Sequence, residues 1–421
     1  MAFVGLCDCN NFFVSCERVF RPDLERKPVM VLSNNDGCVV ARSNEVKALG
    51  IKMGVPLYQV RDLVKRHNIA VFSSNYQLYG DMSARVMNIL RQSAPDIEVY
   101  SIDEAFLNLD EMPLDTLQPF ARNLSARIRR EVGIPVSIGI SPTKTLAKIA
   151  SKLCKKYPKL QGGCLMYRPQ DVEKVLSTFP AGDVWGIGRR SNAKLLSMGI
   201  ETALGYYNLP QAVVDRVFNL PGLRTWKELH GEPCIGFEDV PQDRQTVCIS
   251  RSFAKEMTTL EELDAAVSTF TAKVAEKLRS GHLCAQQMSV FILTNRFRED
   301  APQSYKIMNT LFDVATDDTL EMSERAALCL RQIFRPGYAY KKAGVMCTRL
   351  VPKRGVQASM LDTVDRSKRA SLMDAIDAIN KVEGNYTVRL ASQGVMDQFS
   401  ARTMTSRKFT TSWDEIMEVK V

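Results

Sequence analysis

Apolar residues follow two different periods along the first 160 positions of the chain. Short apolar runs of strand length alternate there with longer stretches in which apolar residues return every three or four positions, as on one face of a helix. We predict strands at residues 3–9, 28–32, 70–73, 97–101, 105–109 and 136–140, and helices at 76–92, 117–131 and 143–156. The motif SNNDGC at 33–38 adds a hairpin-type Asp-Gly turn. The alternation predicts an α+β or α/β sheet domain.

The pattern changes after Gly162 and Gly163. Helical periodicity over 172–176, 189–198 and 212–219, interrupted by Pro180, Pro210 and Pro221, predicts a small helical domain. An irregular linker is expected at 233–246. Residues 246–350 then fit the order β, α, β, β, α, β, with helices at 265–280 and 322–333 and strands at 287–293 and 343–348. A last amphipathic helix is predicted at 369–382.

Composition limits the class of protein. A chain of 421 residues exceeds what one hydrophobic core supports, so three or four domains are expected. The 45% hydrophobic and 24% charged content is ordinary for a soluble protein. There is no basic leader and no apolar run of membrane length, so we expect a cytoplasmic protein without a membrane contact.

The numbers of cysteines and histidines and the distribution of charge limit the kinds of active site that the chain can contain. Eleven irregularly spaced cysteines without a C-x-x-C pair are more typical of buried reduced thiols than of zinc or disulfide sites. Three scattered histidines weaken a His-dependent hydrolase. Residues 1–110 hold 12 basic against 13 acidic residues, whereas 111–245 hold 19 against 13 and 246–421 hold 25 against 21. Basic later domains suit a nucleic-acid enzyme.

Two places put carboxylates inside apolar strands. Asp8 interrupts the run GLCDC, and Asp103 with Glu104 interrupts the run EVYSIDEAFLNL. An acid pair at a strand junction can be only a solvated turn, but a buried carboxylate near two others requires a cation. Oxygen ligands with almost no histidine favour Mg²⁺ or Mn²⁺ and hence a two-metal phosphoryl or nucleotidyl transfer site. Strand alternation places Cys7 and Cys9 on the face opposite Asp8.

Basic residues gather after these acids. Lys144, Lys148, Lys152, Lys155 and Lys159 fall largely on one stripe of the helix predicted at 143–156 and its end. Such a stripe is either a solvated face or a surface that neutralises triphosphate or DNA backbone. The motif VWGIGRR at 184–190 leads into a helix, where backbone N–H groups can hold a phosphate; it could also be an ordinary turn between helices.

Together these motifs resemble those of the Y-family translesion DNA polymerases. The resemblance is carried by DCNNFF, SNNDGCVVARSNEVKALGIKMG, SSNYQLYGDMS, YSIDEAF, GISPTKTLAKIASKL and DVWGIGRR. It is strongest toward the UmuC-type catalytic subunits of bacterial DNA polymerase V and covers nearly the whole chain.

The resemblance implies an α+β multidomain, right-hand architecture. It has a mixed-sheet palm at 1–20 and 77–168, small fingers at 21–76 and a helical thumb with a helix-hairpin-helix at 169–232. A βαββαβ little finger follows at 245–350, with a C-terminal extension at 351–421.

The resemblance also implies residue roles. Asp8, Asp103 and Glu104 would be catalytic and would ligate two Mg²⁺ ions, replaceable by Mn²⁺, with the Cys9 backbone carbonyl. Phe13 would be the steric gate that excludes ribonucleotides. The implied nucleotide contacts are Phe12, Phe13, Arg42, Asn44, Lys47 and Lys155, and the implied DNA contacts are Gly186, Gly188, Arg189, Arg190 and Arg251. Where this chain has Asn44 and Lys47, relatives often carry Tyr and Arg, and a lysine lacks the bidentate fork of arginine.

The implied activity is error-prone, DNA-directed DNA synthesis in the SOS response, without proofreading. Its substrates would be primer-template DNA and dNTPs, and its implied partners are a UmuD′-type dimer, RecA and the sliding clamp. The sequence QASML at 357–361 resembles a degenerate clamp-binding peptide through Gln357, Met360 and Leu361, although a plain linker fits the same residues. The alternatives are a non-enzymatic DNA-damage-response scaffold and a nucleotide cyclase.

Overall fold

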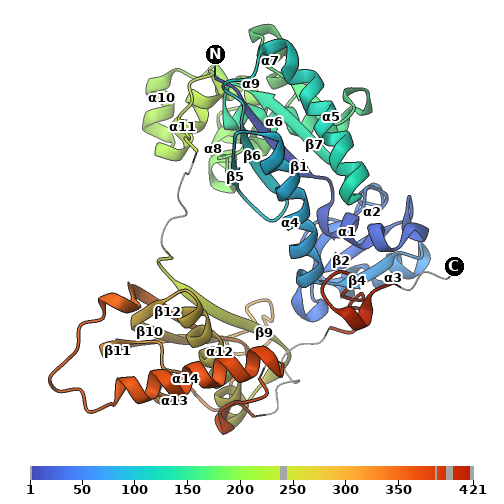
Figure 1. Cartoon of the computed structure of the whole chain (residues 1–421). Coiled ribbons are helices and arrows are strands. Elements are labelled where there is room, and N and C mark those ends of the chain that lie inside the picture. The colour runs from blue at the N-terminus through green and yellow to red at the C-terminus, as the bar shows by residue number, and fades with distance from the viewer. Residues whose placement is uncertain (1, 238–243, 385, 395–401, 418–421) are drawn as a thin grey trace. The chain divides into compact units, whose positions relative to one another are not determined.

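The chain divides into two compact units. The computed structural model describes residues 2–237, 244–384, 386–394 and 402–417. The first unit comprises residues 1–241 together with 403–421, and the second comprises 242–402 (Figure 1). The extension predicted at 351–421 is therefore shared between the two units.

The first unit is built on a five-stranded sheet of order β5-β6-β1-β7-β8. Its strands are β1 (Val4–Cys9), β5 (Asp96–Val99), β6 (Glu104–Asn108), β7 (Val136–Ser141) and β8 (Gly163–Leu165). Its helices are α4 (Tyr76–Ser93), α5 (Leu114–Val132) and α6 (Lys144–Lys156). The strands and helices predicted in this region are confirmed, while β8, only three residues long, was not foreseen.

The helices cover the two faces of this sheet. Cys7 and Cys9 point toward the side chains of α4 and α5, whereas Leu6 packs with Ala147 of α6 on the opposite face. Helix α6 lies very close to β7, because a Cβ atom at Gly139 would be 2.2 Å from the backbone nitrogen of Ser151. Glycine at this position lets α6 approach the sheet, so that its side chains reach the end of β1.

A second, three-stranded sheet lies in the same unit, in the order β3-β2-β4. It contains β2 (Val29–Leu32), β3 (Val39–Arg42) and β4 (Ala70–Ser73), and it is accompanied by α1 (Phe12–Phe20), α2 (Asn44–Ala48) and α3 (Leu57–Arg66). The hairpin predicted at 33–38 joins β2 to β3. Its left-handed residues are Asn35 and Asp36 rather than Gly37, whose φ is −78°.

The predicted helical region is confirmed and contains more helices than its pattern suggested. It comprises α7 (Pro169–Leu176), α8 (Arg189–Ser197), α9 (Ala203–Tyr207), α10 (Gln211–Val217) and α11 (Leu220–Leu229). Helix α11 was missed because Pro221 was interpreted as a helix breaker. Proline is tolerated in the first turn, where its missing N–H has no intrahelical partner.

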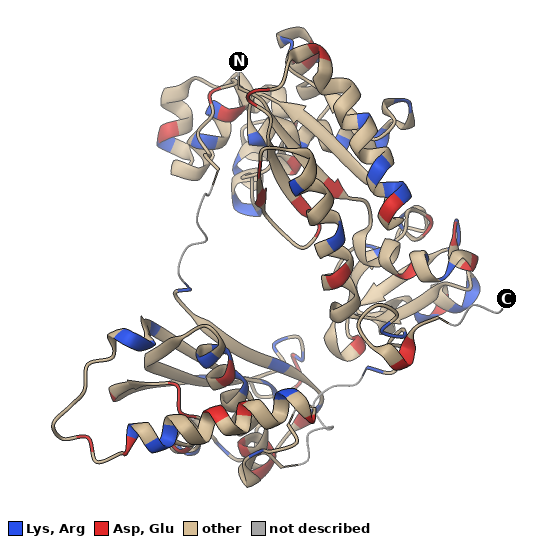
Figure 2. Cartoon of the chain, viewed as in Figure 1, with Lys and Arg blue, Asp and Glu red and all other residues tan. Residues whose placement is uncertain are grey.

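The second unit has the predicted order β, α, β, β, α, β. Its elements are β9 (Val247–Met257), α12 (Leu260–Ser280), β10 (Leu283–Thr294), β11 (Tyr305–Thr316), α13 (Thr319–Ile333) and β12 (Tyr340–Pro352), and the sheet order is β11-β10-β12-β9. Both helices pack into one core with this sheet. Helix α14 (Arg366–Val382) follows and carries charges of both signs (Figure 2). Part of the linker predicted at 233–246, residues 238–243, lies outside the described residues.

No helix in the described part of the chain is long and apolar enough to cross a bilayer.

Candidate active site

Asp8 and Glu104 lie side by side at one end of the five-stranded sheet. They are direct partners in the antiparallel pairing of β1 with β6. Their side chains are only 14% and 20% exposed. Asp103 directly precedes β6, and its backbone carbonyl accepts a hydrogen bond of 2.8 Å from the backbone N–H of Cys9. The pairing of β1 with β6 therefore brings the three predicted acids to the same end of the sheet. This end, with Asp8, Asp103 and Glu104, is called the acidic edge below.

Two lysines of α6 neutralise this edge. Lys155 Nζ lies 2.7 Å from Asp8 Oδ1, and Lys148 Nζ lies 2.9 Å from Glu104 Oε2. Burial raises the pKa of Asp8 to about 6, the Lys155 ammonium opposes this shift, and the charges of Glu104 and Asp103 add to it. The edge thus concentrates negative charge that needs nearby cations.

The atoms of the acidic residues that could ligate a metal ion at this edge are carboxylate oxygens. Asp103 Oδ1 accepts a hydrogen bond of 2.6 Å from the Ser101 hydroxyl, so its carboxylate is oriented from within the same loop. Within the described residues, no three His, Cys, Asp or Glu side chains come close enough together to hold a metal ion. The donor chemistry fits Mg²⁺, which takes one or two carboxylates and completes its shell with water and phosphate oxygens.

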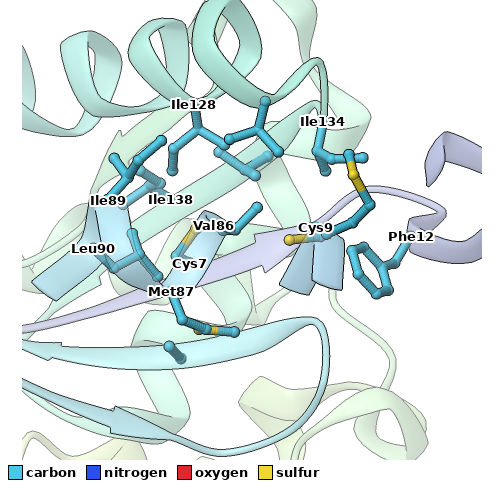
Figure 3. Packing of buried hydrophobic residues seen from close by; sticks show 14 of the residues in the cluster. Cys7, Cys9, Phe12, Val86, Met87, Ile89, Leu90, Ile128, Ile134 and Ile138 are labelled. Carbon is cyan, nitrogen blue, oxygen red and sulfur yellow. The ribbon is translucent and has the colours of Figure 1, made fainter. Parts of the chain in front are cut away.

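The two cysteines beside Asp8 belong to the core. Cys7 and Cys9 are 1% and 3% exposed and lie among apolar side chains such as Val86 and Ile138 (Figure 3). Burial is the main reason why the pKa of each thiol is raised, which keeps both thiols protonated. Cys9 can therefore face the acidic edge only through its backbone.

A cavity of about 230 Å³ adjoins the acids. Asp8, Glu104, Lys148 and Lys152 line it together with Trp185. Trp185 belongs to the VWGIGRR motif, and its indole N–H donates to the Tyr100 hydroxyl over 3.3 Å. Sequence reasoning treated this motif as a phosphate-binding turn or an ordinary turn between helices, and did not foresee that its tryptophan borders the acidic edge.

Arg42, Lys47 and Lys155 form a cluster of cations near Asp8. Burial lowers the pKa of Lys47, and the positive charges of Lys155 and Arg42 lower it further. Nε and Nη1 of Arg42 are buried, and no described residue accepts a hydrogen bond from them. A cationic cluster with unused donors favours an anionic ligand.

The polar neighbours of this cluster include Asn44. Lys47 Nζ donates to Asn11 Oδ1 over 2.6 Å, and Asn11 Nδ2 donates to Asn44 Oδ1 over 3.2 Å. Asn11 has a left-handed backbone with φ of 48° just before α1. It was not singled out from the sequence, although asparagine is one of the few residues that adopt this conformation readily.

The predicted lysine stripe is only partly present. Lys144 is 1% exposed and pairs with Glu98 at 2.6 Å, which removes it from any exposed surface. Lys159 lies outside α6, in a short 3-10 turn. Lys148, Lys152 and Lys155 remain, and Lys152 Nζ donates to the Asp183 carbonyl over 2.7 Å. Including Lys144 was wrong because the first turn of α6 is buried.

Glu228 explains part of that burial. It is fully buried, and its Oε2 accepts from the backbone N–H of Thr145 over 2.9 Å, in the first turn of α6. A carboxylate at a helix N-terminus is stabilised by the helix dipole. Glu228 thereby ties α11 to the helix that carries Lys148 and Lys155, a role that no local motif indicated.

Phe12 and Phe13, at the start of α1, differ in burial. Phe12 is 3% exposed and packs into the core. The Phe13 ring is stacked on Tyr79, with ring centroids 4.5 Å apart, and meets Tyr76 edge-on at 5.7 Å. Of the two side chains, Phe13 is the one that is partly exposed.

The predicted DNA-binding residues of the first unit lie around the start of α8. Gly188 is the N-cap residue, and Arg189 and Arg190 follow with exposed side chains. Gly186 has φ of +93°, and a Cβ atom there would lie 2.1 Å from Thr225 Oγ1, so only glycine fits.

The remaining predicted residues belong to the second unit. Arg251 is a half-buried residue of β9, paired with Ala343 of β12. Gln357, Met360 and Leu361 lie between β12 and α14, and Met360 and Leu361 are 103% and 90% exposed.

Comparison with known proteins agrees with this architecture. Residues 7–152 match the impB/mucB/samB family, and 244–360 match the C-terminal domain of that family. Residues 370–419 match a domain of unknown function. Protein UmuC of Salmonella typhimurium is 38% identical over 99% of this chain and 100% of its own length. DNA polymerase IV of Moorella thermoacetica is 28% identical over 92% of this chain and 94% of its own.

Solved structures show the same fold. A Y-family DNA polymerase chimera of Dbh and Dpo4 covers 83% of this chain and 99% of its own, with a TM-score of 0.68 at 20% identity. The fold is therefore that of the Y-family DNA polymerases, as the sequence motifs predicted. The chain belongs to the impB/mucB/samB family. Its similarity to the UmuC relative extends over the full length of both chains.

Proposed function

We propose that this chain is an error-prone DNA-directed DNA polymerase that performs translesion synthesis in the SOS response. Membership of a family that includes UmuC, and similarity to DNA polymerase IV, support polymerase activity. The observation that carries the proposal is the pair Asp8 and Glu104 on adjacent strands, bordered by the cations Arg42, Lys47 and Lys155. Carboxylates beside a cluster of cations suit nucleotidyl transfer.

The acids would hold two Mg²⁺ ions, with Mn²⁺ as a substitute. Asp8, Asp103 and Glu104 are the carboxylate ligands in this proposal, and the Cys9 carbonyl is a backbone ligand. When bound, the ions supply the positive charge that stabilises the attacking and leaving oxygens of the displacement at the α-phosphate. Lys155 and Lys148 balance the carboxylates when no metal is bound.

The nucleotide would be held by the protein's own cations and shaped by Phe13. Arg42 and Lys47 would neutralise the triphosphate, and Lys155, which lies 2.7 Å from Asp8, would be a third cation for it. Asn44 would orient Lys47 both directly, since its Oδ1 accepts from Lys47 Nζ over 3.4 Å, and through Asn11. The exposed part of the Phe13 ring would crowd the 2′ position of the sugar and exclude ribonucleotides. Phe12 is confined to the core, so its side chain can act only by supporting this arrangement.

DNA binding is assigned to backbone and arginine contacts that do not read sequence. Gly186, Gly188, Arg189 and Arg190 would hold a phosphate at the start of α8, and Arg251 would contact the duplex from the second unit. Contacts in the nucleotide pocket alone supply only a few kcal/mol of discrimination, so we expect low fidelity without excision of errors.

The proposed partners follow from the relationship to UmuC. They are a UmuD′-type dimer, RecA and the sliding clamp, all met in the bacterial cytoplasm. The exposed side chains of Met360 and Leu361 support a peptide at 357–361 that is available to a clamp.

Primer extension by the purified full-length chain tests the proposal. The templates carry either no lesion or one abasic site, and each reaction is run with and without a UmuD′-type dimer and a RecA filament. We expect extension past the abasic site that depends on template, dNTP and Mg²⁺. DNA binding without extension in every condition would instead support a non-enzymatic scaffold. Cyclic nucleotide formation without primer and template would support a cyclase.

A further inference from the structure

The C-terminal segment 403–416 packs against the small sheet of the first unit. The backbone of Ser73, at the end of β4, donates to the Met404 carbonyl over 2.9 Å, and Ser73 forms a parallel bridge with Thr405. Phe409 stacks on Phe20 of α1, with ring centroids 4.6 Å apart. The segment, red in Figure 1, therefore lies beside β4 although more than 300 residues separate them in sequence. It falls within the domain of unknown function.

Ser406 reaches inward from this segment. Its hydroxyl donates to Glu17 Oε1 over 3.0 Å. It also accepts a hydrogen bond of 3.0 Å from Asn75 Nδ2, which donates to the Ser406 carbonyl as well, over 3.2 Å. Asn75 is the N-cap residue of α4, and its Oδ1 accepts from the Leu78 N–H. Ser406 thus joins the middle of α1 to the beginning of α4.

The acceptor, Glu17, is a fully buried carboxylate of α1. Its Oε1 also accepts from the Tyr79 hydroxyl over 2.7 Å, and Oε2 has no hydrogen-bond partner among the described residues. Burial is the main cause of the raised pKa of Glu17. A buried carboxyl with so few partners depends strongly on each donor that it has.

Tyr79 connects Glu17 to Phe13, because it contacts both residues. Tyr79 is itself fully buried, and its ring is the surface on which the Phe13 ring is stacked, at an interplanar angle of 15°. The Tyr79 hydroxyl is the polar end of that ring and is held by Glu17. A continuous series of contacts therefore runs from Ser406 through Glu17 and Tyr79 to Phe13.

We propose that Ser406 is a positioning residue for sugar selection, which holds the Phe13 ring in place through Glu17 and Tyr79. The proposal rests on the function assigned to Phe13 above and gives the C-terminal domain of unknown function a defined task. Sugar discrimination depends on a clash between Phe13 and one hydroxyl group, so a small displacement of the ring is enough to weaken it. Use of dNTPs has no such clash and tolerates the displacement.

The test compares incorporation of dNTP and rNTP by the full-length chain under single-turnover and steady-state conditions. Ser406→Ala should raise kcat/KM for rNTP about fivefold and leave kcat/KM for dNTP within about twofold, because it removes one hydrogen bond to a buried acid. Ser406→Thr keeps the hydroxyl and should restore discrimination. Ser412→Ala is the matched control, since it makes the same change in the same segment where the hydroxyl makes no cap hydrogen bond.

Two further variants test whether Ser406 acts on sugar selection through Tyr79 and the Phe13 ring. Tyr79→Phe removes only the hydroxyl at the other end of the series and should also raise rNTP use. In the double variant Phe13→Ala/Ser406→Ala, rNTP use should equal that of Phe13→Ala alone, because both changes act through one ring. Unchanged discrimination in Ser406→Ala and Tyr79→Phe, or an additive effect in the double variant, would overturn the proposal and leave the polymerase assignment intact. Unchanged discrimination in Phe13→Ala would overturn the sugar-gate assignment itself.

Discussion

Asp8 and Glu104 are direct partners across β1 and β6, and each is paired with a lysine from the same helix, α6. This relationship joins three segments that are far apart in sequence into one site. It also means that the carboxylates carry their own counter-charges.

Removing either carboxylate should abolish catalysis without unfolding the chain. We expect Asp8→Asn and Glu104→Gln to lower the rate of primer extension about 100-fold or more, because each removes a carboxylate that would hold a Mg²⁺ ion at the reacting phosphate. Affinity for primer-template DNA, measured by fluorescence anisotropy, should remain. Asp96→Asn, an exposed acid of β5 in the same sheet, is the control and should extend primers normally.

Chelation of divalent ions should abolish primer extension but leave thermal stability nearly unchanged. Treatment with EDTA should stop primer extension, and Mg²⁺ or Mn²⁺ should restore it. The melting temperature should change little, because Lys155 and Lys148 already neutralise Asp8 and Glu104 without metal. A large loss of thermal stability on chelation would indicate a structural metal instead. Calorimetry with and without EDTA measures this.

Lys155 should act on the nucleotide more than on DNA. We expect Lys155→Ala to lower kcat/KM for dNTP by about 10- to 100-fold, the value of a charge-assisted hydrogen bond. Lys155→Arg should recover part of the loss, since it keeps the charge with a different shape. DNA affinity should not change. Equal losses in DNA and dNTP affinity would argue that Lys155 contacts the DNA backbone.

Phe13→Ala should relax the choice of sugar. We expect kcat/KM for rNTP to rise about 10- to 100-fold, as expected when a steric contact in a binding pocket is removed. Incorporation of dNTP should persist at a reduced rate, because the ring also supports the sugar. Single-nucleotide incorporation with each of the rNTPs measures the change. Tyr76→Phe keeps the neighbouring ring and serves as the comparison.

The clamp peptide can be tested without disturbing the fold. Met360→Ala with Leu361→Ala should eliminate stimulation of primer extension by the sliding clamp, and the melting temperature should not change, because both side chains are almost fully exposed. Extension in the absence of clamp should equal that of the unmodified chain. Full stimulation of the double variant would identify residues 357–361 as a plain linker.

Local patterns were sufficient for most elements of the fold. The alternation of periods predicted the central strands, α4 to α6 and the βαββαβ order of the second unit, and these were confirmed. The prediction was wrong for Lys144, which looked like a member of a solvated stripe. Its burial depends on Glu98 and on the Gly236 carbonyl, 46 and 92 residues away, and no local window contains them.

By itself, the sequence determined which side chains are out of place in a core. Asp8 and Glu104 belong to otherwise apolar strands, and Asp103 directly precedes one. That conflict can be read from a few neighbouring residues because strand burial is a local pattern. Only the tertiary structure decided what surrounds them. The pairing of Lys155 with Asp8, the unpartnered donors of Arg42 and the contacts from Ser406 to Phe13 depend on chain segments brought together by packing. Hydrogen bonds and burial at such distances leave no periodic trace in the sequence, so the misplaced carboxylates could be recognised from the sequence and the groups that surround them could not.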